Sequence, residues 1–281
     1  MRRYAFVLFL LVPALAFAQA PIIRSGNGIL NSGGFQQGVP IAPGSLVSIF
    51  GSNLASQLSI HDTYPLSTSR AGVTVQFVTT QSVGLAGGTK VFDAAVQDTV
   101  PPDPTTGLSQ INAQVPWNLL SNGGTATVNV IVTNNGVPSA PSPVTIGSFG
   151  PGIFTLGTRA IAANFPDPTF AWPTGAVAGL TSRPAKVGDV VTIYATGLGA
   201  VDVPVADGAN TLDALRTNTN TPMVLVGNVS APILFSGLAP SFAGVNIVNI
   251  RIPTVPAGDN VPVQIVAGGV SSNTATIAVG P

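Results

Sequence analysis

The sequence predicts an all-β protein built from two similar domains in tandem. The first observation is an apolar content of 45% combined with 32 Gly and 25 Pro among 281 residues. Apolar segments cut by frequent turn residues are typical of short strands. The second is that the chain has no Glu and few Lys, so common helix formers are missing. The third is a repeated segment: residues 42–54 (APGSLVSIFGSNL) match residues 185–198 (AKVGDVVTIYATGL).

Six segments of the first half predict strands. The segment 73–78 (VTVQFV) alternates apolar and polar residues, as in a strand with one buried face. Pro116 ends the strand before it, because proline cannot donate a hydrogen bond to a neighbouring strand. The Asn135-Gly136 pair supplies the positive φ that a hairpin turn needs. The predicted strands cover residues 45–50, 73–78, 91–96, 111–115, 125–133 and 142–146.

The second half repeats this order of strands and turns. Turns are predicted at 227–228 and 268–269, where Gly and Asn residues separate apolar segments. Pro253 ends a strand as Pro116 does in the first half. The predicted strands cover residues 190–194, 223–226, 233–235, 245–252, 261–266 and 274–279.

Two further matches support a duplication of whole domains. Residues 107–116 align with 244–253, which places Asn112 opposite Asn249, and the hairpin 124–137 aligns with 258–270. Three matches in the same order are not expected by chance between two glycine-rich segments. The first copy carries additional residues, predicted as insertions at 82–90 and 99–106. The predicted organisation is a signal peptide (1–18), a leader with one short strand at 28–30 (19–38), a first β-sandwich (39–147), a connector (148–183) and a second β-sandwich (184–281).

The N-terminus predicts export. Arg2 and Arg3 precede an apolar segment at 5–18 that ends in a small-x-small cleavage signal, Ala16-Phe17-Ala18. An uncleaved anchor is the alternative interpretation. No later segment is apolar for long enough to predict a membrane span after cleavage. The expected location is secreted or at the cell surface, with the periplasm as the alternative compartment, and zero Cys means that no disulfide contributes to stability.

Charge is scarce and balanced. Charged residues make up 7% of the chain, against about 25% in an average protein. There are 10 Lys and Arg, and 10 acidic residues, all of them Asp. A nucleic-acid partner needs a basic surface, which this composition does not supply. The same argument applies to an anionic membrane surface.

The sequence predicts a protein that is not an enzyme, with no catalytic, cofactor-binding or metal-binding residues. His61 is the only histidine, so it would have to serve any Ser-His-Asp site, and it is expected to be a surface loop residue. Zero Cys and one His do not make a zinc site. Calcium remains open at Asp98 with Asp103, or at Asp202 with Asp207, although Asp also favours turns by bonding to its own backbone.

Four residues are candidate ligand or partner contacts: Trp117, Trp172, Asp98 and Asp103. The tryptophans would suit a polysaccharide module that stacks sugars on aromatic rings, although Trp117 is also expected to fill the edge of a sandwich or to pack against the connector. The aromatic residues of the connector predict that it packs against the domains. Phe50 and Tyr194 occupy equivalent repeat positions and are predicted to be core residues.

Asn112 and Asn249 also occupy equivalent positions in the two copies. Both are predicted to be structural residues whose side chains bond to the backbone.

The repeated segments resemble the Solibacter uncharacterised C-terminal domain family of exported acidobacterial proteins. The resemblance implies a pair of immunoglobulin-like β-sandwiches akin to IPT/TIG domains, and it implies no established activity. The sequence departs from the family pattern at 79–103, a long insertion where partner specificity is expected to differ. The matching segments are 42–51 (APGSLVSIFG), 110–117 (QINAQVPW), 151–155 (PGIFT), 188–199 (GDVVTIYATGLG), 235–240 (FSGLAP) and 248–253 (VNIRIP).

These observations together predict a secreted or cell-surface, non-enzymatic module for adhesion, matrix formation or assembly. Its partner is an unidentified protein or polysaccharide outside the cell. The first alternative is an extracellular polysaccharide-binding module. The less favoured alternative is a hydrolase that uses Asp residues and His61.

Overall fold

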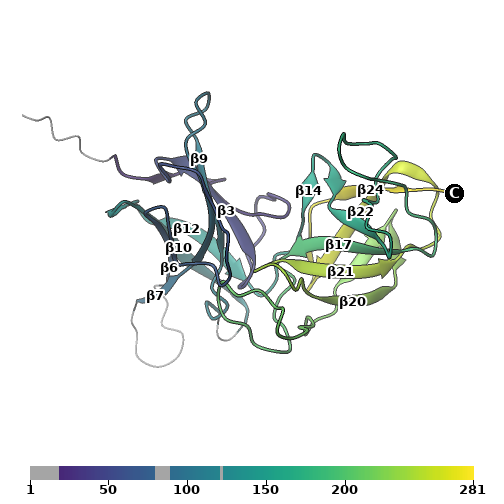
Figure 1. The fold of residues 1–281 in the computed structure, drawn as a ribbon. Coiled ribbons are helices and arrows are strands. Elements are labelled where there is room, and N and C mark those ends of the chain that lie inside the picture. The colour runs from purple at the N-terminus through teal and green to yellow at the C-terminus, as the bar shows by residue number, and fades with distance from the viewer. Residues whose placement is uncertain (1–18, 80–88, 121–122) are drawn as a thin grey trace, which may run out of the picture.

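The computed structural model describes residues 19–79, 89–120 and 123–281, which form strands, turns and loops arranged in two lobes (Figure 1). The prediction of an all-β fold is confirmed. Among the described residues, no helix is long and apolar enough to cross a membrane. The predicted signal peptide and the insertion residues 80–88 lie outside the described residues.

The first lobe contains two antiparallel sheets. One has the strand order β1-β3-β9-β8-β4, with β2 also paired to β3. The other has the order β11-β10-β6-β5, with β12 also on β10 and β7 on β6. The strands are β1 (Ile22–Ile23), β2 (Ile29–Asn31), β3 (Leu46–Ser52), β4 (Ser59–Ile60), β5 (Ser69–Arg70), β6 (Val73–Thr79), β7 (Lys90–Asp93), β8 (Ala95–Val100), β9 (Ser109–Gln114), β10 (Thr125–Asn134), β11 (Val137–Pro138) and β12 (Ser142–Gly147).

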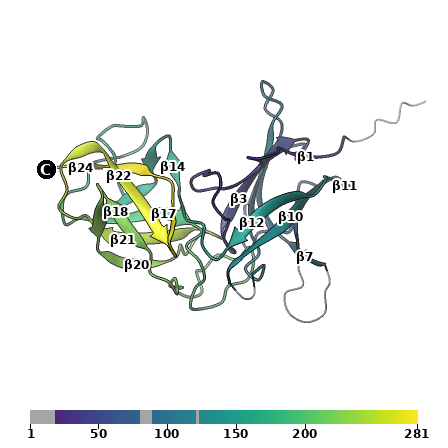
Figure 2. The ribbon, with the colours of Figure 1, turned by 180° about the vertical axis from the view of Figure 1, so that it is seen from behind.

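The second lobe also contains two sheets. One has the order β13-β17-β21-β20, with β16 on β17, and the other has the order β14-β15-β24-β22-β18-β19, with β23 on β22. Figure 2 shows the second sheet from behind. The strands are β13 (Gly152–Ile153), β14 (Thr155–Leu156), β15 (Arg159–Ala160), β16 (Ala162–Phe165), β17 (Val190–Thr196), β18 (Met223–Val226), β19 (Val229–Ala231), β20 (Ile233–Leu238), β21 (Asn246–Arg251), β22 (Gly258–Ala267), β23 (Val270–Ser271) and β24 (Ala275–Val279).

The two lobes share one strand order, and this order is immunoglobulin-like. The series β3-β9-β8 and β12-β10-β6-β7 in the first lobe correspond to β17-β21-β20 and β24-β22-β18-β19 in the second. The three-strand series follow the B-E-D order of immunoglobulin domains. The four-strand series follow the G-F-C order with a C′ strand added next to C. In each lobe a residue shortly before β3 or β17 forms a parallel bridge to the last strand of the sandwich, β12 or β24. The bridged pairs are Ile41 with Ile146 and Ala185 with Val279. The chain therefore folds as two tandem immunoglobulin-like β-sandwiches.

Each sandwich has its own hydrophobic core. In β6 the residues Val73, Val75 and Phe77 are fully buried, while the polar residues between them are half-buried, as the alternating sequence predicts. The core of the second sandwich is built in the same way, for example by Ile193 of β17 and Ile265 of β22. Burial of these apolar side chains is the main source of stability in a chain with no cysteine.

Part of the segment predicted as a long insertion, 79–103, consists of strands that both sandwiches share. Within it, Lys90–Asp93 and Ala95–Val100 form β7 and β8, which pair in their sheets as β19 and β20 do in the second sandwich. These residues are therefore two ordinary strands in different sheets, whereas the sequence predicted one strand at 91–96. The segment 148–183, predicted as a connector that packs against the domains, supplies β13 to β16 to the second sandwich, so this sandwich begins before residue 184.

The repeated segments contact each other between the lobes. The backbone N–H of Leu46 in β3 donates a hydrogen bond to Oγ1 of Thr196 in β17 (3.0 Å). The Thr196 hydroxyl in turn donates to the carbonyl oxygen of Gly244 (2.6 Å). A small apolar cluster surrounds this contact, with Leu46 and Val245 buried in it. The repeat therefore forms both the equivalent strands and part of the surface that joins them.

A second contact comes from the loop 200–217 of the second lobe, green in Figure 1. The backbone N–H of Gly208 donates to Oε1 of Gln114 (2.6 Å), and its carbonyl oxygen accepts the N–H of Leu66 (2.8 Å). Oδ1 of Asp207 accepts the backbone N–H of Trp117 (2.8 Å). Hydrogen bonds at separate places restrict the movement of one lobe against the other.

Replacing Asp207 with asparagine is expected to stabilise the protein at neutral pH. Burial raises the pKa of the Asp207 carboxyl, and the hydrogen bond from Trp117 only partly opposes this effect. A carboxyl whose pKa is raised by folding adds stability below its ordinary pKa of about 3.9, and this stability is lost as the pH rises through the raised value. Asparagine keeps an acceptor oxygen for the N–H of Trp117 and carries no charge.

Chemical unfolding of both proteins between about pH 3 and about pH 8 measures this difference. The free energy of unfolding of Asp207→Asn should exceed that of the wild type increasingly as the pH rises. A variant that is less stable than the wild type at neutral pH would show that the charged hydrogen bond outweighs the cost of burial.

Candidate functional site

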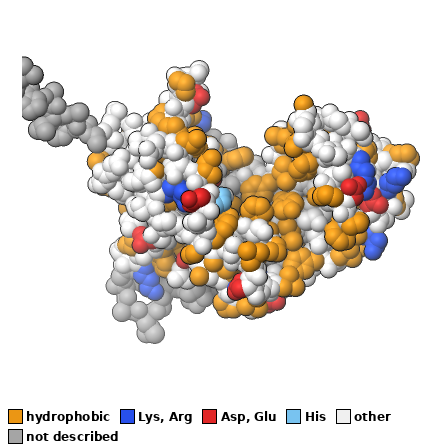
Figure 3. Space-filling view, viewed as in Figure 1, with side chains coloured by type: hydrophobic (Ala, Val, Ile, Leu, Met, Phe, Trp, Pro, Cys, Tyr) orange, Lys and Arg blue, Asp and Glu red, His pale blue; other side chains and the backbone are white. Residues whose placement is uncertain are grey.

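A groove with a volume of about 650 Å³ lies between the two sandwiches. One wall is the outer face of the β3-β9-β8 sheet, and the other comes from the second sandwich. Figure 3 shows the hollow between the lobes, with apolar side chains gathered on the second lobe and the histidine on the first. The volume is within the range of about 300–1,000 Å³ that is usual for ligand sites.

Three polar side chains cross the first wall in one row. Ser48 of β3 pairs in register with Asn112 of β9, which pairs in register with Asp98 of β8. We call these three residues the polar row. They point outward because their neighbours along the strands, such as Ile49 and Ile111, fill the core.

Hydrogen bonds join the polar row into one network. The Ser48 hydroxyl donates to Oδ1 of Asn112 (2.8 Å), and Nδ2 of Asn112 donates to Oδ2 of Asp98 (3.4 Å). Nε2 of Gln110, also on β9, donates to the same Asn112 oxygen (2.8 Å). The network holds the side chains in place before a ligand arrives.

The row continues to His61 and Tyr64. Nδ1 of His61 lies 3.1 Å from Oδ1 of Asp98, and the Tyr64 hydroxyl lies 3.1 Å from Nε2 of His61. Burial raises the pKa of the Tyr64 phenol, which therefore keeps its proton at neutral pH. The carboxylate on Nδ1 of His61 is that of Asp98, but the hydroxyl on Nε2 is the phenol of Tyr64 and not a serine hydroxyl, so these described contacts do not form a Ser-His-Asp site.

The second wall is aromatic, formed by Phe154, Phe170, Tyr194 and Phe242, which we call the aromatic wall. Tyr194 lies on the outer face of β17 because its two neighbours, Ile193 and Ala195, point into the core. Phe242 is 45% exposed and offers its ring to solvent.

A buried tryptophan supports one ring of this wall. Phe170 stacks on Trp172 with ring centroids 4.2 Å apart and an interplanar angle of 10°. Trp172 is fully buried, and its Nε1–H donates to the carbonyl oxygen of Ala160 (2.6 Å). Trp172 therefore positions Phe170 and does not itself reach the surface.

The candidate contacts predicted from the sequence lie in different places. Asp98 belongs to the polar row, and Trp172 lies beneath the aromatic wall. Trp117 is half-buried where the lobes meet, against Gly44 and next to Asp207. Only Asp98 of the four lines the groove.

Asp103 lies at the tip of an exposed loop. Its Oδ1 accepts the backbone N–H groups of Thr105 (2.9 Å) and Thr106 (2.8 Å), and these hydrogen bonds lower the pKa of the Asp103 carboxyl. This is the turn geometry that Asp favours. Residues 19–79, 89–120 and 123–281 contain no group of three His, Cys, Asp or Glu that could hold a metal ion.

Two interpretations of repeat positions were wrong. Phe50 and Tyr194 are half-buried on outer faces instead of in the cores, and Phe50 lies 6.0 Å from Phe35, centroid to centroid. Asn112 bonds to side chains of the groove and not to the backbone. Its counterpart Asn249 lies on an outer face of the second sandwich, where its Oδ1 has no partner within the described part of the chain.

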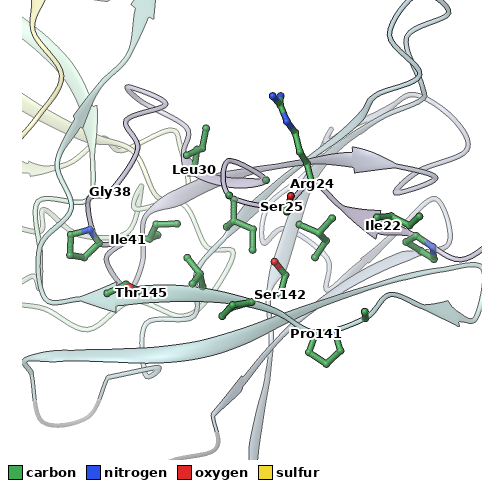
Figure 4. A pocket seen from close by; sticks show the side chains of 18 of the residues that line it. Ile22, Arg24, Ser25, Leu30, Gly38, Ile41, Pro141, Ser142 and Thr145 are labelled. Carbon is green, nitrogen blue, oxygen red and sulfur yellow. The ribbon is translucent and has the colours of Figure 1, made fainter.

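A second cavity of about 780 Å³ opens at the edge of the first sandwich. It lies between β1 and β2 on one side and the start of β12 on the other (Figure 4). Aliphatic and small side chains line it, and the Arg24 side chain extends away from Ser142 and Thr145. With few polar side chains pointing together, this cavity supplies less specificity than the groove.

No protein-family model and no curated protein matches the chain. Solved structures align with it at low identity. Domains 5–6 of the S-layer protein SbsC are 11% identical (92% of this chain, 98% of that chain, TM-score 0.22). The C-terminal domain of the Streptococcus agalactiae AgI/II polypeptide BspA is 13% identical (93% and 100%, TM-score 0.19). The titin Ig tandem A164–A165 is 8% identical (86% and 95%, TM-score 0.20).

TM-scores this low carry no argument about fold or function. The immunoglobulin-like assignment therefore rests on the strand order of the two sandwiches. The resemblance to the Solibacter family stays a prediction.

Proposed function

We propose that the protein is an exported, non-enzymatic adhesion module that binds its partner in the groove between the two sandwiches. The observation that carries the proposal is the construction of the groove. Its two walls come from different sandwiches, and hydrogen bonds between the lobes hold these walls opposite each other. A site held in place before binding avoids part of the entropy cost of ordering side chains and domains.

The chemistry of the groove supports binding without catalysis. Asp98 is the one carboxylate among the described residues of its lining, whereas glycoside hydrolysis uses a facing pair. The neighbouring His61 is held between Asp98 and Tyr64. These polar groups bond to one another and present donors and acceptors, which suits recognition.

The N-terminal sequence supports a location outside the cytoplasm. A basic start, an apolar segment and a small-x-small site indicate export to the cell exterior or surface, with the periplasm as the alternative. A fold that needs no disulfide and carries few charges is also suited to packing in a surface layer or matrix. The partner is a protein or polysaccharide of that environment.

Filling the groove is expected to reduce binding of the purified protein to isolated cell envelopes by about tenfold or more. Ala163 lies half-buried on the outer face of β16 and lines the groove, so Ala163→Trp places an indole ring in it. Thr127→Trp is the matched control, because Thr127 is exposed on β10, in the other sheet of the first sandwich. Sedimentation of labelled protein with envelope and matrix fractions measures the affinity.

The control should bind like the wild type, and thermal denaturation should show both variants folded. Equal binding by Ala163→Trp and the wild type would contradict the proposal, since the groove would then play no part. A wild-type protein that stays free and monomeric with every fraction would contradict it as well.

A further inference from the structure

We infer that the groove binds a segment of neutral polysaccharide, with sugar rings against the aromatic wall and hydroxyl groups on the polar row. This inference rests on the proposed function and names its ligand class. It starts from charge: Asp98 is the only charged residue among the described residues that line the groove. An anionic glycan would meet a carboxylate and no Lys or Arg, so repulsion and the missing cation disfavour it.

The polar row matches hydroxyl groups. Each sugar hydroxyl is both a donor and an acceptor, as are the side-chain amides of Asn and Gln, while a carboxylate accepts. Within the described part of the chain, Oδ2 of Asp98 has only the long 3.4 Å contact from Asn112, so it retains capacity to accept a ligand hydroxyl. Gln97 and Gln110 are half-buried in the lining and add amide groups beside the row. Neutral groups that donate and accept together favour a polyhydroxyl ligand over a purely apolar one.

The aromatic wall matches the other face of a sugar. A pyranose ring has an apolar face of C–H groups, which gains free energy when an aromatic ring removes it from water. Phe170 is held flat on Trp172, and Phe242 lines the groove with its side chain partly exposed. A ligand between the two walls must therefore be apolar on one side and rich in hydroxyl groups on the other.

The two walls also explain why a chain of sugars fits better than a single one. The groove is open along its side, and its volume of about 650 Å³ exceeds what one hexose fills. Its walls cannot easily separate, because the Leu46–Thr196 and Gln114–Gly208 hydrogen bonds join the sandwiches. Several weak sugar contacts then add without a large cost of closing the site.

The test measures retention of the full protein on neutral and anionic polysaccharides. The neutral probes are cellulose, a soluble β-glucan and mannan, and the anionic probes are alginate and polygalacturonate. The wild type should bind at least one neutral probe and bind the anionic ones about tenfold more weakly or not at all. Affinity electrophoresis gives the dissociation constants for the soluble probes.

Two variants and two matched controls locate the binding site. Phe242→Ala should weaken binding to the neutral probe about fivefold or more, and Asn112→Ala about tenfold. The control for the first is Phe165→Ala, a residue of the same sandwich that is 64% exposed and does not line the groove. The control for the second is Asn249→Ala, the repeat counterpart, which also lies outside the groove lining. Both controls should bind like the wild type, and thermal denaturation checks that all four proteins are folded.

The outcomes separate this inference from the proposed function. The inference is supported if Phe242→Ala and Asn112→Ala lose binding to the neutral glycan while both controls keep it. Binding to anionic probes only, or equal losses in the controls, overturns it. If no polysaccharide is retained while Ala163→Trp still abolishes envelope binding, the groove serves a protein partner, so the inference fails and the proposed function stands. If neither glycan nor envelope binds, both fail.

Discussion

Replacing Gly44 with alanine is expected to lower the free energy of unfolding by about 3 kcal/mol. Gly44 has a φ of +76°, which costs an alanine about 1 kcal/mol of backbone strain. A methyl group there would also overlap the indole ring of Trp117. The backbone N–H of Trp117 donates a hydrogen bond to Asp207 of the other lobe. The ring must move, and overpacking of this kind costs about 1–3 kcal/mol.

The repeat supplies a matched control for this change. Gly188 is the counterpart of Gly44 and has a φ of +90°, but an added methyl group there meets nothing within 4 Å. Gly188→Ala should therefore cost only the backbone strain, about 1 kcal/mol. Urea unfolding of both variants measures the two values. Equal losses would show that Trp117 is free to move and does not fix the contact between the lobes.

Replacing Trp172 with alanine is expected to lower the free energy of unfolding by about 4 kcal/mol. The side chain is fully buried, so its removal leaves a large cavity at the edge of the second sandwich. The carbonyl oxygen of Ala160 also loses its hydrogen bond from Nε1. Phe170 loses the ring that supports it, so binding in the groove should weaken as well.

Trp172→Phe is the control that separates these effects. It keeps a ring beneath Phe170 and removes only the hydrogen bond to Ala160 and part of the volume, so it should cost about 2 kcal/mol. Urea unfolding gives the stabilities, and binding to the neutral probe at a temperature where both variants are folded gives the effect on the groove. A Trp172→Ala protein as stable as the wild type would contradict the role of this side chain.

Local sequence was sufficient for many of the strands, but the strand predicted at 91–96 is two strands in different sheets, and β13 to β16 lie in the predicted connector. The prediction of 73–78 corresponds to β6, and the prediction of 223–226 has the same bounds as β18. The turn predicted at Asn135-Gly136 is present, with φ values of 49° and 82°. These features depend on alternation and on backbone conformation, both of which act between neighbouring residues.

The candidate site was only partly predictable. Asp98 was named from the sequence, but the aromatic wall was missed because its members come from separate parts of the chain. Tyr194 was predicted to be a core residue because it occupies the same repeat position as Phe50, but a repeat position alone does not say what covers the outer face of the strand. The outward alternation of Gln110 and Asn112 on β9 was the one available signal for the polar row.

The sequence thus determines the two sandwiches, their order of strands and the positions that repeat, because hydrophobic alternation and turn chemistry are local. Only the tertiary structure decides what the repeat positions do. Gly44 packs against Trp117 while Gly188 faces open space, and Asn112 enters a groove that Asn249 does not line. The physical reason is that the two copies face each other, so equivalent residues meet different neighbours, and contacts between distant segments leave no pattern in either copy.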